Sequence, residues 1–208
     1  RLALKYASLS KFKIPFPPLP EQKKIASILT SVDEVIEKTQ SQIDKLQDLK
    51  KGTMNELLTK GIGHTEFKDS DLGRIPKGWE VKSLSELKLD ISDGNYSTKY
   101  PTSNEFIENG IPFLRANNIG ALEINAKDLR YISPEKHAEL KKGHLKRNDI
   151  LISTRGEIGK VCLVQDSFID VNINAQMVRV NGGKILNHHF LLYIMSSNFC
   201  KKQFRNLQ

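Results

Sequence analysis

Side chains that could do covalent or metal chemistry are few in this 208-residue sequence, and their spacing does not favour it. Cys162 and Cys200 form no C-x-x-C pair and have no histidine at metal-ligand spacing. We expect two buried free thiols in a reducing cytosol, with a disulfide between them as the alternative. His188 and His189 are adjacent, and adjacent side chains diverge on a helix or a strand. The sequence therefore predicts no metal site.

The motifs of catalytic domains are also missing. The sequence has no glycine-rich cofactor loop, no Asn/Asp-Pro-Pro-aromatic motif of a base methyltransferase, no nucleotide-binding P-loop, no G-x-S-x-G and no H-E-x-x-H. Asp71, Glu80 and Lys82 loosely fit a metal-dependent nuclease pattern, D…E-x-K, but they straddle a Pro-Gly linker, and such matches arise often by chance. The Gly-Ile-Gly at 61–63 follows a predicted helix, which favours a helix cap over a phosphate site.

A more frequent pattern is polar and basic side chains beside glycine, in loops that join apolar runs. Lys and Arg neutralise DNA phosphates, whereas Arg, Asn, Gln, Lys and Thr also read base edges. Segments 93–101, 115–118, 154–160 and 172–176 fit base contacts, and the basic segment 141–147 fits phosphate or solvent. The candidate DNA contacts are Asn95, Tyr96, Lys99, Arg115, Asn117, Asn118, Lys141, Lys142, Thr154, Arg155, Lys160, Asn172, Asn174 and Gln176.

Each of these segments also has a plain structural interpretation. Asn and Gly favour turns for local reasons, and a run of charges is often only a solvated face. Arg155, expected between two strands, could pair with a buried acid instead of with DNA. The segments gain weight as a DNA surface only when they are taken together with the charge of the chain.

The positive charge is concentrated in the second half of the chain. The formal net charge is +8, which suits a polyanionic partner but is weak evidence alone. Residues 20–60 hold seven basic and seven acidic residues, and residues 61–110 hold six and nine. Residues 111–208 hold fifteen basic and eight acidic residues, an excess of +7, and they contain most of the candidate contact segments.

A long helix is expected to precede this basic region. The prolines within residues 14–20 require extended chain and lead into a helix, because proline is tolerated in a first helical turn. Residues 21–59 contain no proline and only one glycine, so they predict a helix of 39 residues, about 58 Å long. Aliphatic residues recur along it at the 4-3 spacing of a coiled-coil seam: Ile25, Leu29, Val32, Ile36, Ile43, Leu46 and Leu57.

A seam this narrow needs a partner helix, and the chain has no second 4-3 pattern of that length. We therefore expect the partner to be a second copy of the chain, forming a homodimer, or a missing part of the same protein. The alternative is an ordinary amphipathic helix packed on a globular core.

The rest of the chain predicts one domain of mixed α and β structure. After a polar linker at 64–78, strands are expected at 79–83, 112–115, 149–153, 160–164 and 176–180, and helices at 134–142 and 187–205. The fold class is thus α+β, with a coiled-coil helix at 20–61 and a mixed domain at 66–208. No apolar run approaches the roughly 20 residues that span a bilayer. Arg1 begins no secretory signal, so we expect an internal piece of a longer protein.

Several motifs, in order from about residue 14 to 180, carry a family resemblance. Pro-Pro-Leu-Pro-Glu-Gln at 17–22 opens the long helix, and Leu-Leu-Thr-Lys-Gly-Ile at 57–62 ends it. Gly-Arg-Ile-Pro-Lys-Gly-Trp-Glu at 73–80 enters the mixed domain, and Asn-Asp-Ile-Leu-Ile-Ser at 148–153 precedes Arg-Gly and Ile-Gly-Lys. In these motifs the chain resembles the specificity (S) subunits of type I restriction–modification enzymes.

The resemblance implies a function as well as a fold. A complete subunit of that family has two target-recognition domains, each reading half of a split double-stranded DNA site, and two helices that form an antiparallel coiled-coil ruler between them. It binds modification subunits that carry S-adenosylmethionine and methylate adenine, and a restriction subunit joins them. ATP and Mg²⁺ are implied as cofactors of those partner subunits. This chain would then be a non-catalytic, cofactor-free, DNA-associated protein of the prokaryotic cytoplasm.

The chain departs from the complete pattern, because it shows one long helix and one recognition domain. Residues 1–19 resemble the tail of a preceding recognition domain, or complete the domain at 66–208 by permutation, so a fragment, a half-sized subunit and a permuted form all remain open. Two other functions remain open as well. One is a coiled-coil scaffold without DNA specificity, and the other is the recognition part of a single-chain restriction–methylation enzyme.

Overall fold

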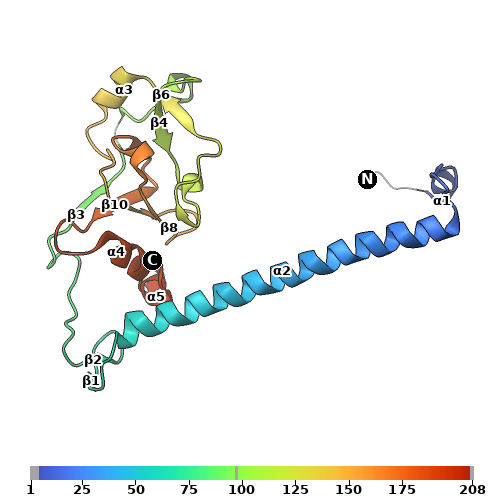
Figure 1. Cartoon of the computed structure of the whole chain (residues 1–208). Coiled ribbons are helices and arrows are strands. Elements are labelled where there is room, and N and C mark those ends of the chain that lie inside the picture. The colour runs from blue at the N-terminus through green and yellow to red at the C-terminus, as the bar shows by residue number, and fades with distance from the viewer. Residues whose placement is uncertain (1–4, 97, 207–208) are drawn as a thin grey trace. The chain divides into compact units, whose positions relative to one another are not determined.

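The structure, a computed structural model, describes residues 5–96 and 98–206. It divides the chain into two compact units, residues 1–52 and 53–208. The first four residues of the predicted domain tail and the last two of the predicted recognition domain lie outside the described residues. Figure 1 shows the helices and strands of both units. Among the described residues, no helix is both long and apolar enough to cross a membrane.

The long helix is present and is slightly longer than predicted. Helix α2 runs over Leu19–Lys60, 42 residues, and is preceded by the single turn α1, Tyr6–Leu9. Residues 12–18 between them have no regular structure, as the prolines required. The first turn of α2 is held by the side chain of Gln22, whose Nε2 donates to the carbonyl oxygen of Pro17 at 2.7 Å. At the other end Gly61 has a φ of +68° and donates to the carbonyl oxygen of Leu57, which is the predicted glycine cap.

The predicted seam of α2 is exposed along its whole length. No residue of this helix is buried. The exposed fractions of the seven seam residues run from 42% at Ile43 to 64% at Leu46. A second helix along the seam stays a prediction. The alternative of a helix packed on a globular core of the same chain stays a prediction as well.

The second unit contains two main sheets and a small hairpin. The larger sheet has the strand order β3 (Asp90–Asp93), β10 (Met177–Asn181), β7 (Ile150–Ser153), β8 (Val161–Leu163) and β5 (Leu122–Glu123). Its pairs are antiparallel except β5 with β8. The smaller sheet has the order β6 (Arg130–Ile132), β4 (Ile111–Leu114) and β9 (Asn172–Ile173), with β4 and β9 parallel. The hairpin pairs β1 (Phe67–Lys68) with β2 (Ile75–Pro76).

Apolar side chains from the strands form the core of this unit. One cluster joins the two sheets through Leu114, Leu151 and Ile173, each almost completely buried. A second lies under helices α4 (His188–Ser196) and α5 (Asn198–Asn206), where Leu191 packs with Ile150. Each such side chain stabilises the fold by about 1.5–3 kcal/mol relative to an exposed one. Single turns of 3₁₀ helix at Ser103–Glu105, Ala116–Asn118 and Asp166–Phe168 and the short helix α3 (Pro134–Glu139) complete the unit.

Most predicted elements are present, and the fold class of a long helix plus a mixed domain is confirmed. Four of the five predicted strands appear as β4, β7, β8 and β10 within one or two residues. The strand predicted at 79–83 is wrong, since these residues have no regular structure and a turn follows at 84–88. There Ser83 and Glu86 exchange bonds: the Ser83 amide donates to the carboxylate at 2.7 Å, and the Glu86 amide donates to the hydroxyl. This reciprocal pair stabilises a local turn.

Of the two predicted helices of the domain, one ends earlier than expected and the other is interrupted. Helix α3 stops at Glu139 because Leu140 adopts extended backbone and places its side chain in the core. The helix expected over 187–205 is interrupted at the buried residue Ser197, which is also extended. The Ser197 hydroxyl donates to the carbonyl oxygen of Ile194 at 2.6 Å and accepts from the amide of Cys200. One side chain thus ends α4 and begins α5.

Candidate nucleic-acid interface

Three of the predicted contact segments cross at one point, where glycines allow their backbones to touch. The Asn95 backbone bridges to that of Asn174, and the amide of Ile173 donates to the carbonyl oxygen of Gly143 at 3.0 Å. A Cβ on Gly94 would lie 2.2 Å from the carbonyl oxygen of Asn174, closer than any side chain permits. Segments 93–101, 141–147 and 172–176 therefore lie side by side only because position 94 is glycine.

The other two segments join the same crossing. The amide of Asn174 donates to the carbonyl oxygen of Leu114 at 2.9 Å, which places Arg115 beside it. The amide of Thr154 donates to the carbonyl oxygen of Gln176 at 2.8 Å. All five segments are thus held together by backbone hydrogen bonds, although they are spread over some eighty residues of sequence.

The β7–β8 turn carries Arg155 into contact with the first segment. The Ser153 hydroxyl closes the turn by donating to the carbonyl oxygen of Glu157 and accepting from the amide of Lys160. The guanidinium of Arg155 lies 5.5 Å from the ring centre of Tyr96, a cation–π contact between two exposed side chains. Both side chains are large, and both face solvent at the edge of the crossing. No buried acid accompanies Arg155 among its described contacts.

Eight of the fourteen predicted contact residues are exposed: Tyr96, Lys99, Asn117, Lys141, Lys142, Arg155, Lys160 and Gln176. Some of these cations already have acidic partners. Lys142 lies 3.3 Å from Asp93, Lys99 lies 3.8 Å from Glu139, and Lys160 pairs with Glu157. Exposed pairs of this kind contribute about 0–1 kcal/mol. A phosphate could therefore displace the carboxylates at small cost.

Four predicted contact residues are buried, and their amides hold the loops instead. Asn118 accepts from the Arg115 amide and donates to two carbonyl oxygens of the 125–127 loop at 3.1 and 2.9 Å. Asn95 donates to the carbonyl oxygen of Lys142 at 3.2 Å. Asn172 and Asn174 are 0% and 5% exposed. In this conformation all four support the surface from below, and base contacts by them stay untested.

The remaining two predicted contact residues, Arg115 and Thr154, are half-buried. The Arg115 guanidinium donates through Nη2 to the carbonyl oxygen of Asp128 at 2.7 Å, while its Nε is buried without a partner. The side chain therefore has part of its bonding capacity committed to the fold. Asn117, two positions further along, is exposed and is the better placed of the two to reach a base edge.

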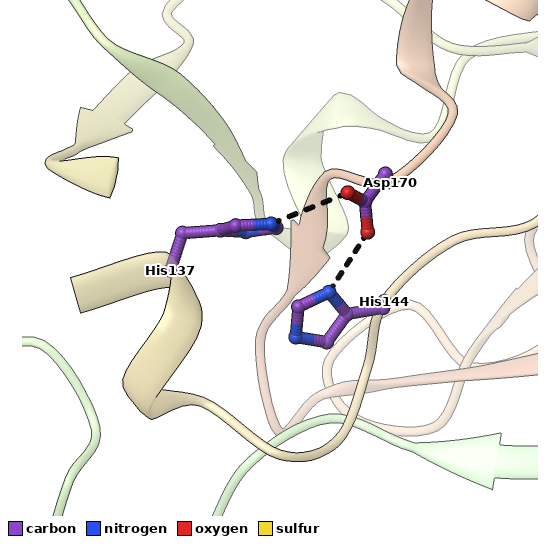
Figure 2. A group of neighbouring side chains, drawn as sticks. All are labelled: His137, His144 and Asp170. Carbon is purple, nitrogen blue, oxygen red and sulfur yellow. Dashed lines mark hydrogen bonds and ion pairs between the residues drawn. The ribbon is translucent and has the colours of Figure 1, made fainter. Parts of the chain in front are cut away.

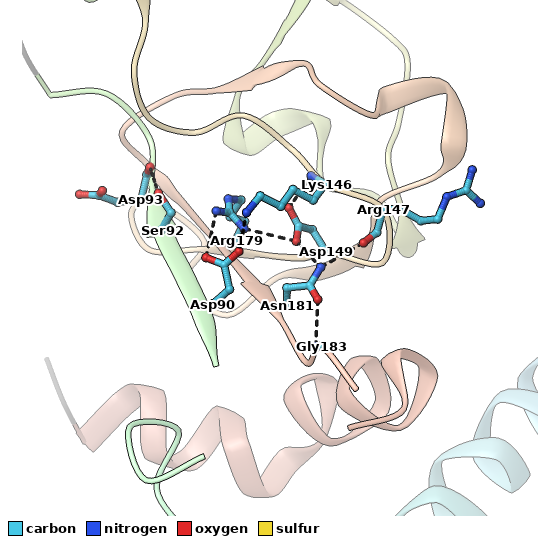
Figure 3. Close-up of polar contacts among 9 residues, drawn as sticks. All are labelled: Asp90, Ser92, Asp93, Lys146, Arg147, Asp149, Arg179, Asn181 and Gly183. Atoms are coloured by element: carbon cyan, nitrogen blue, oxygen red, sulfur yellow. Dashed lines mark hydrogen bonds and ion pairs between the residues drawn. The ribbon is translucent and has the colours of Figure 1, made fainter. Parts of the chain in front are cut away.

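A buried ion network, which the sequence analysis missed, supports one side of the larger sheet (Figure 3). Arg179 of β10 donates to both carboxylate oxygens of Asp90, at 3.0 and 3.1 Å, and lies 3.5 Å from the fully buried Asp149. Asn181 and the Lys146 amide complete the bonds to Asp149 at 2.7 Å each. The arginine that pairs with a buried acid is thus Arg179 and not Arg155. An arginine inside an otherwise apolar strand was the signal available in the sequence.

The two carboxylates of this network respond in opposite ways. Burial raises the pKa of Asp149, although Asn181, Lys146 and Arg179 act against the shift. The pKa of Asp90 is lowered, first by its hydrogen bonds from Arg179 and then by those from Lys146. Lys146 and Arg147, two cations of the predicted phosphate-binding segment, are paired with Asp90 at 2.8 Å and Asp166 at 3.0 Å. Within that segment the cations nearest the crossing are therefore Lys141 and Lys142.

The histidines and cysteines lie partly where the sequence suggested. The ring centres of His188 and His189 lie 4.4 Å apart with their planes tilted by 43°, so the expectation that these side chains diverge is wrong. They have no third potential metal ligand among the described residues, whereas His137 and His144 gather with Asp170. This second group was not predicted. Both cysteines are free: Cys162 is buried, as expected, and Cys200 is half-buried. Burial raises the pKa of the Cys162 thiol to about 12.

Comparison with known proteins decides the family. A family described as the type I restriction modification DNA specificity domain matches residues 2–48 and 76–207. The chain belongs to this family. The type I restriction enzyme MjaVIII specificity subunit of Methanocaldococcus jannaschii is 35% identical over 201 residues, which cover 94% of this chain and 46% of that protein. The EcoBI specificity subunit of Escherichia coli is 27% identical over 197 residues, which cover 88% of this chain and 41% of that protein.

A solved structure agrees on the fold of this DNA specificity domain. The HsdS subunit from Thermoanaerobacter tengcongensis superimposes with a TM-score of 0.54 at 22% identity, over 92% of this chain and 44% of that one. This specificity domain spans less than half the length of each of these three relatives. The resemblance drawn from the sequence motifs is thereby confirmed. The family match includes both the long helix, to residue 48, and the mixed domain with its five converging loops.

Proposed function

We propose that this chain recognises DNA sequence for a type I restriction–modification complex, reading one half of a bipartite site. The observation that carries the proposal is the crossing at Gly94, which gathers five polar loops on one surface and leaves Tyr96, Arg155 and Gln176 exposed there. Arginine and glutamine offer bidentate contacts to base edges in the major groove. The +7 excess in residues 111–208 suits the phosphates around them.

Selection from a randomised duplex pool, with the modification subunit present, tests this proposal. We expect one enriched sequence for the native chain and an altered preference for Gln176→Ala and Arg155→Ala. Arg155→Lys is the matched variant, because it keeps the charge but loses the planar fork that grips guanine. It should retain non-specific affinity and lose about 1–3 kcal/mol of discrimination at one base pair. An unselective native chain would refute the proposal.

The lysines beside the crossing are proposed to bind phosphate. Lys141→Ala with Lys142→Ala should weaken binding to all duplexes and reduce the slope of log affinity against log salt, by about 0.9 for each phosphate that these lysines neutralise. Lys184→Ala is the control, because this exposed lysine follows the opposite end of β10 from Gln176. An equal change in the Lys184 variant would show that general charge, and not this surface, binds the phosphates. A coiled-coil scaffold would show little affinity for DNA even at low salt.

The exposed seam of α2 is proposed to pair with a second helix, in a second copy of the chain or in a segment outside it. Pairing would set the distance between two recognition surfaces. The molar mass in solution tests the homodimer, and Ile36→Glu with Ile43→Glu should abolish a dimer where Lys38→Glu, on the charged face, leaves it intact. If the native chain is a monomer, and the Ile36/Ile43 double variant has the same molar mass, the partner helix lies outside this chain.

The chemistry of the complex is proposed to reside in other subunits. The chain would dock modification subunits that bind S-adenosylmethionine and, through them, a restriction subunit that uses ATP and Mg²⁺, and would itself be a non-catalytic component on DNA in the prokaryotic cytoplasm. The family match supports this division of labour. Reconstitution tests it: methylation of a duplex should need both the chain and the modification subunit, and the chain alone should transfer no methyl group.

A further inference from the structure

The cluster of His137, His144 and Asp170 brings together side chains from three segments of the mixed domain (Figure 2). His137 lies on helix α3, and His144 lies in the loop that follows it. Asp170 comes just before β9. Antiparallel bridging fixes the last two, because the amide of Asp170 donates to the carbonyl oxygen of Leu145 at 2.8 Å and His144 bridges to Asn172. The backbone therefore places these side chains together.

The outer nitrogen of each imidazole already has an acceptor. His144 Nε2 lies 2.5 Å from the carbonyl oxygen of Leu140, which can only accept, so Nε2 must carry the hydrogen. His137 Nδ1 lies 2.5 Å from the amide oxygen of Asn172, whose Nδ2 is buried without a hydrogen-bond partner among the described residues. The assignment at His144 is fixed by chemistry alone, since a backbone carbonyl has no nitrogen that could take the place of its oxygen.

The inner nitrogens face a carboxylate. His144 Nδ1 lies 3.0 Å from one oxygen of Asp170, and His137 Nε2 lies 3.5 Å from the other. A neutral imidazole carries one N–H, so with the hydrogen of His144 on Nε2 its Nδ1 turns a lone pair to the carboxylate. A cation between them, either a second proton on the imidazole or a metal ion, is attracted by both groups.

We propose that His137 Nε2, His144 Nδ1 and the carboxylate of Asp170 bind one divalent transition-metal ion of the Zn²⁺ class. Imidazole and carboxylate are ligands that Zn²⁺ accepts, and metal-bound histidines typically donate their other N–H to a carbonyl oxygen, as both do here. In a tetrahedral site with bonds of about 2.0–2.1 Å, neighbouring ligand atoms are about 3.3 Å apart. The three ligand atoms lie within 4.8 Å of one another, so shifts of roughly 1 Å would close the site.

The ion would join helix α3, the 140–149 loop and the start of β9. The loop between the two histidines carries Lys141 and Lys142, so the ion would hold these lysines in place and add positive charge beside them. Three protein ligands leave a fourth position open to water. The metal site stands on its own geometry, whether or not the lysines bind DNA.

Direct measurement of Zn²⁺ uptake tests the proposal without DNA. The full chain, freed of metal by a chelator and dialysed, is titrated with Zn²⁺ against a chromophoric competitor, and bound metal is counted. We expect one Zn²⁺ per chain, an affinity at least about tenfold weaker in His144→Gln, and a rise in the unfolding temperature on adding Zn²⁺. Co²⁺ in place of Zn²⁺ should give the intense visible absorption of a four-coordinate site.

Asp170→Asn separates metal binding from folding. Asp170 has a φ of +61°, a backbone conformation that asparagine also accepts, and its side chain is 71% exposed. The new amide could donate to the inner nitrogen of His144, so the metal-free variant should be at least as stable as the native chain and should gain nothing from Zn²⁺. His188→Gln with His189→Gln removes the other histidine pair and should leave uptake unchanged. No Zn²⁺ uptake by the native chain, or full uptake by Asp170→Asn, would overturn the proposal.

Discussion

Removal of Arg179 should destabilise the mixed domain by leaving a charge buried in it. The side chain of Arg179 is 8% exposed and that of Asp149 is 0% exposed, so Arg179→Leu strands a carboxylate that water cannot reach. Breaking a buried pair in this way costs about 3–5 kcal/mol. The lower part of that range applies here, because Asn181 and the Lys146 amide still donate to Asp149. Asp90, whose side chain is 45% exposed, adds at most about 1 kcal/mol.

The size of this effect can be measured on the full chain. Because the 42-residue helix α2 contributes heavily to circular dichroism, amide hydrogen exchange in β7 and β10 under increasing urea is the better probe of the domain. We expect a loss of about 3–4 kcal/mol in Arg179→Leu. Adding Asp149→Asn should restore at least half of it, since the amide keeps the bond from Asn181 without the charge.

The pH dependence gives this reasoning a second test. Since burial raises the pKa of Asp149 above its unfolded value, its protonated form favours the folded state, and that contribution is lost as pH rises through the folded pKa. The Arg179→Leu variant should therefore lose more stability as pH rises above about 4 than the variant that also carries Asp149→Asn. A loss below about 1 kcal/mol in the single variant, or a double variant no more stable than the single, would refute a buried charge as the cause.

Three further perturbations have defined outcomes. Gly94→Ala should cost about 1–3 kcal/mol through the clash with Asn174, whereas Gly52→Ala, which meets no atom within 4 Å on α2, should stabilise by about 0.5–1 kcal/mol; urea midpoints check both. Hydrogen bonds from Lys136 and Thr102 lower the pKa of Glu105 to about 2. Its stabilising contribution is thus present above pH 4.5 and lost as pH falls towards 2. In Glu105→Gln the free energy of unfolding should fall less over that pH range. Cys162 should resist iodoacetamide at pH 8 until urea unfolds the domain, which mass spectrometry would show.

The sequence predicted the elements that depend on local pattern. Strands β7 and β10 follow from apolar runs between polar segments, and α2 follows from 4-3 spacing without proline. The strand expected at 79–83 is absent. The alternation of apolar and polar residues there favours a strand, but the hydrogen bonds between Ser83 and Glu86 stabilise a turn instead. The single helix expected at the C-terminal end failed because a serine in mid-helix can also end one helix and cap the next.

The sequence predicted the residue types of the candidate site, but not which of these residues are buried. Arg155 and Gln176 are exposed, but asparagine serves equally well as a surface contact and as an internal clamp, so nothing local marked Asn118 or Asn172 as buried. The histidine cluster was invisible for another reason. His144 and Asp170 are far apart in sequence and meet only because segment 143–145 bridges to segment 171–173. Such neighbours follow from the fold and produce no recognisable spacing in the sequence.

The close approach of Gly94, Gly143 and Asn174 limits how this protein can acquire a new specificity. A Cβ at either glycine meets neighbouring backbone or side-chain atoms, and every predicted contact loop is hydrogen-bonded to another, so a change of length or course in one of them shifts the rest. Transplanting a single loop from a relative should therefore give a misfolded hybrid more often than a new preference. Exchange of the whole mixed domain keeps these loop contacts together, and engineers seeking new targets should exchange segments of that size.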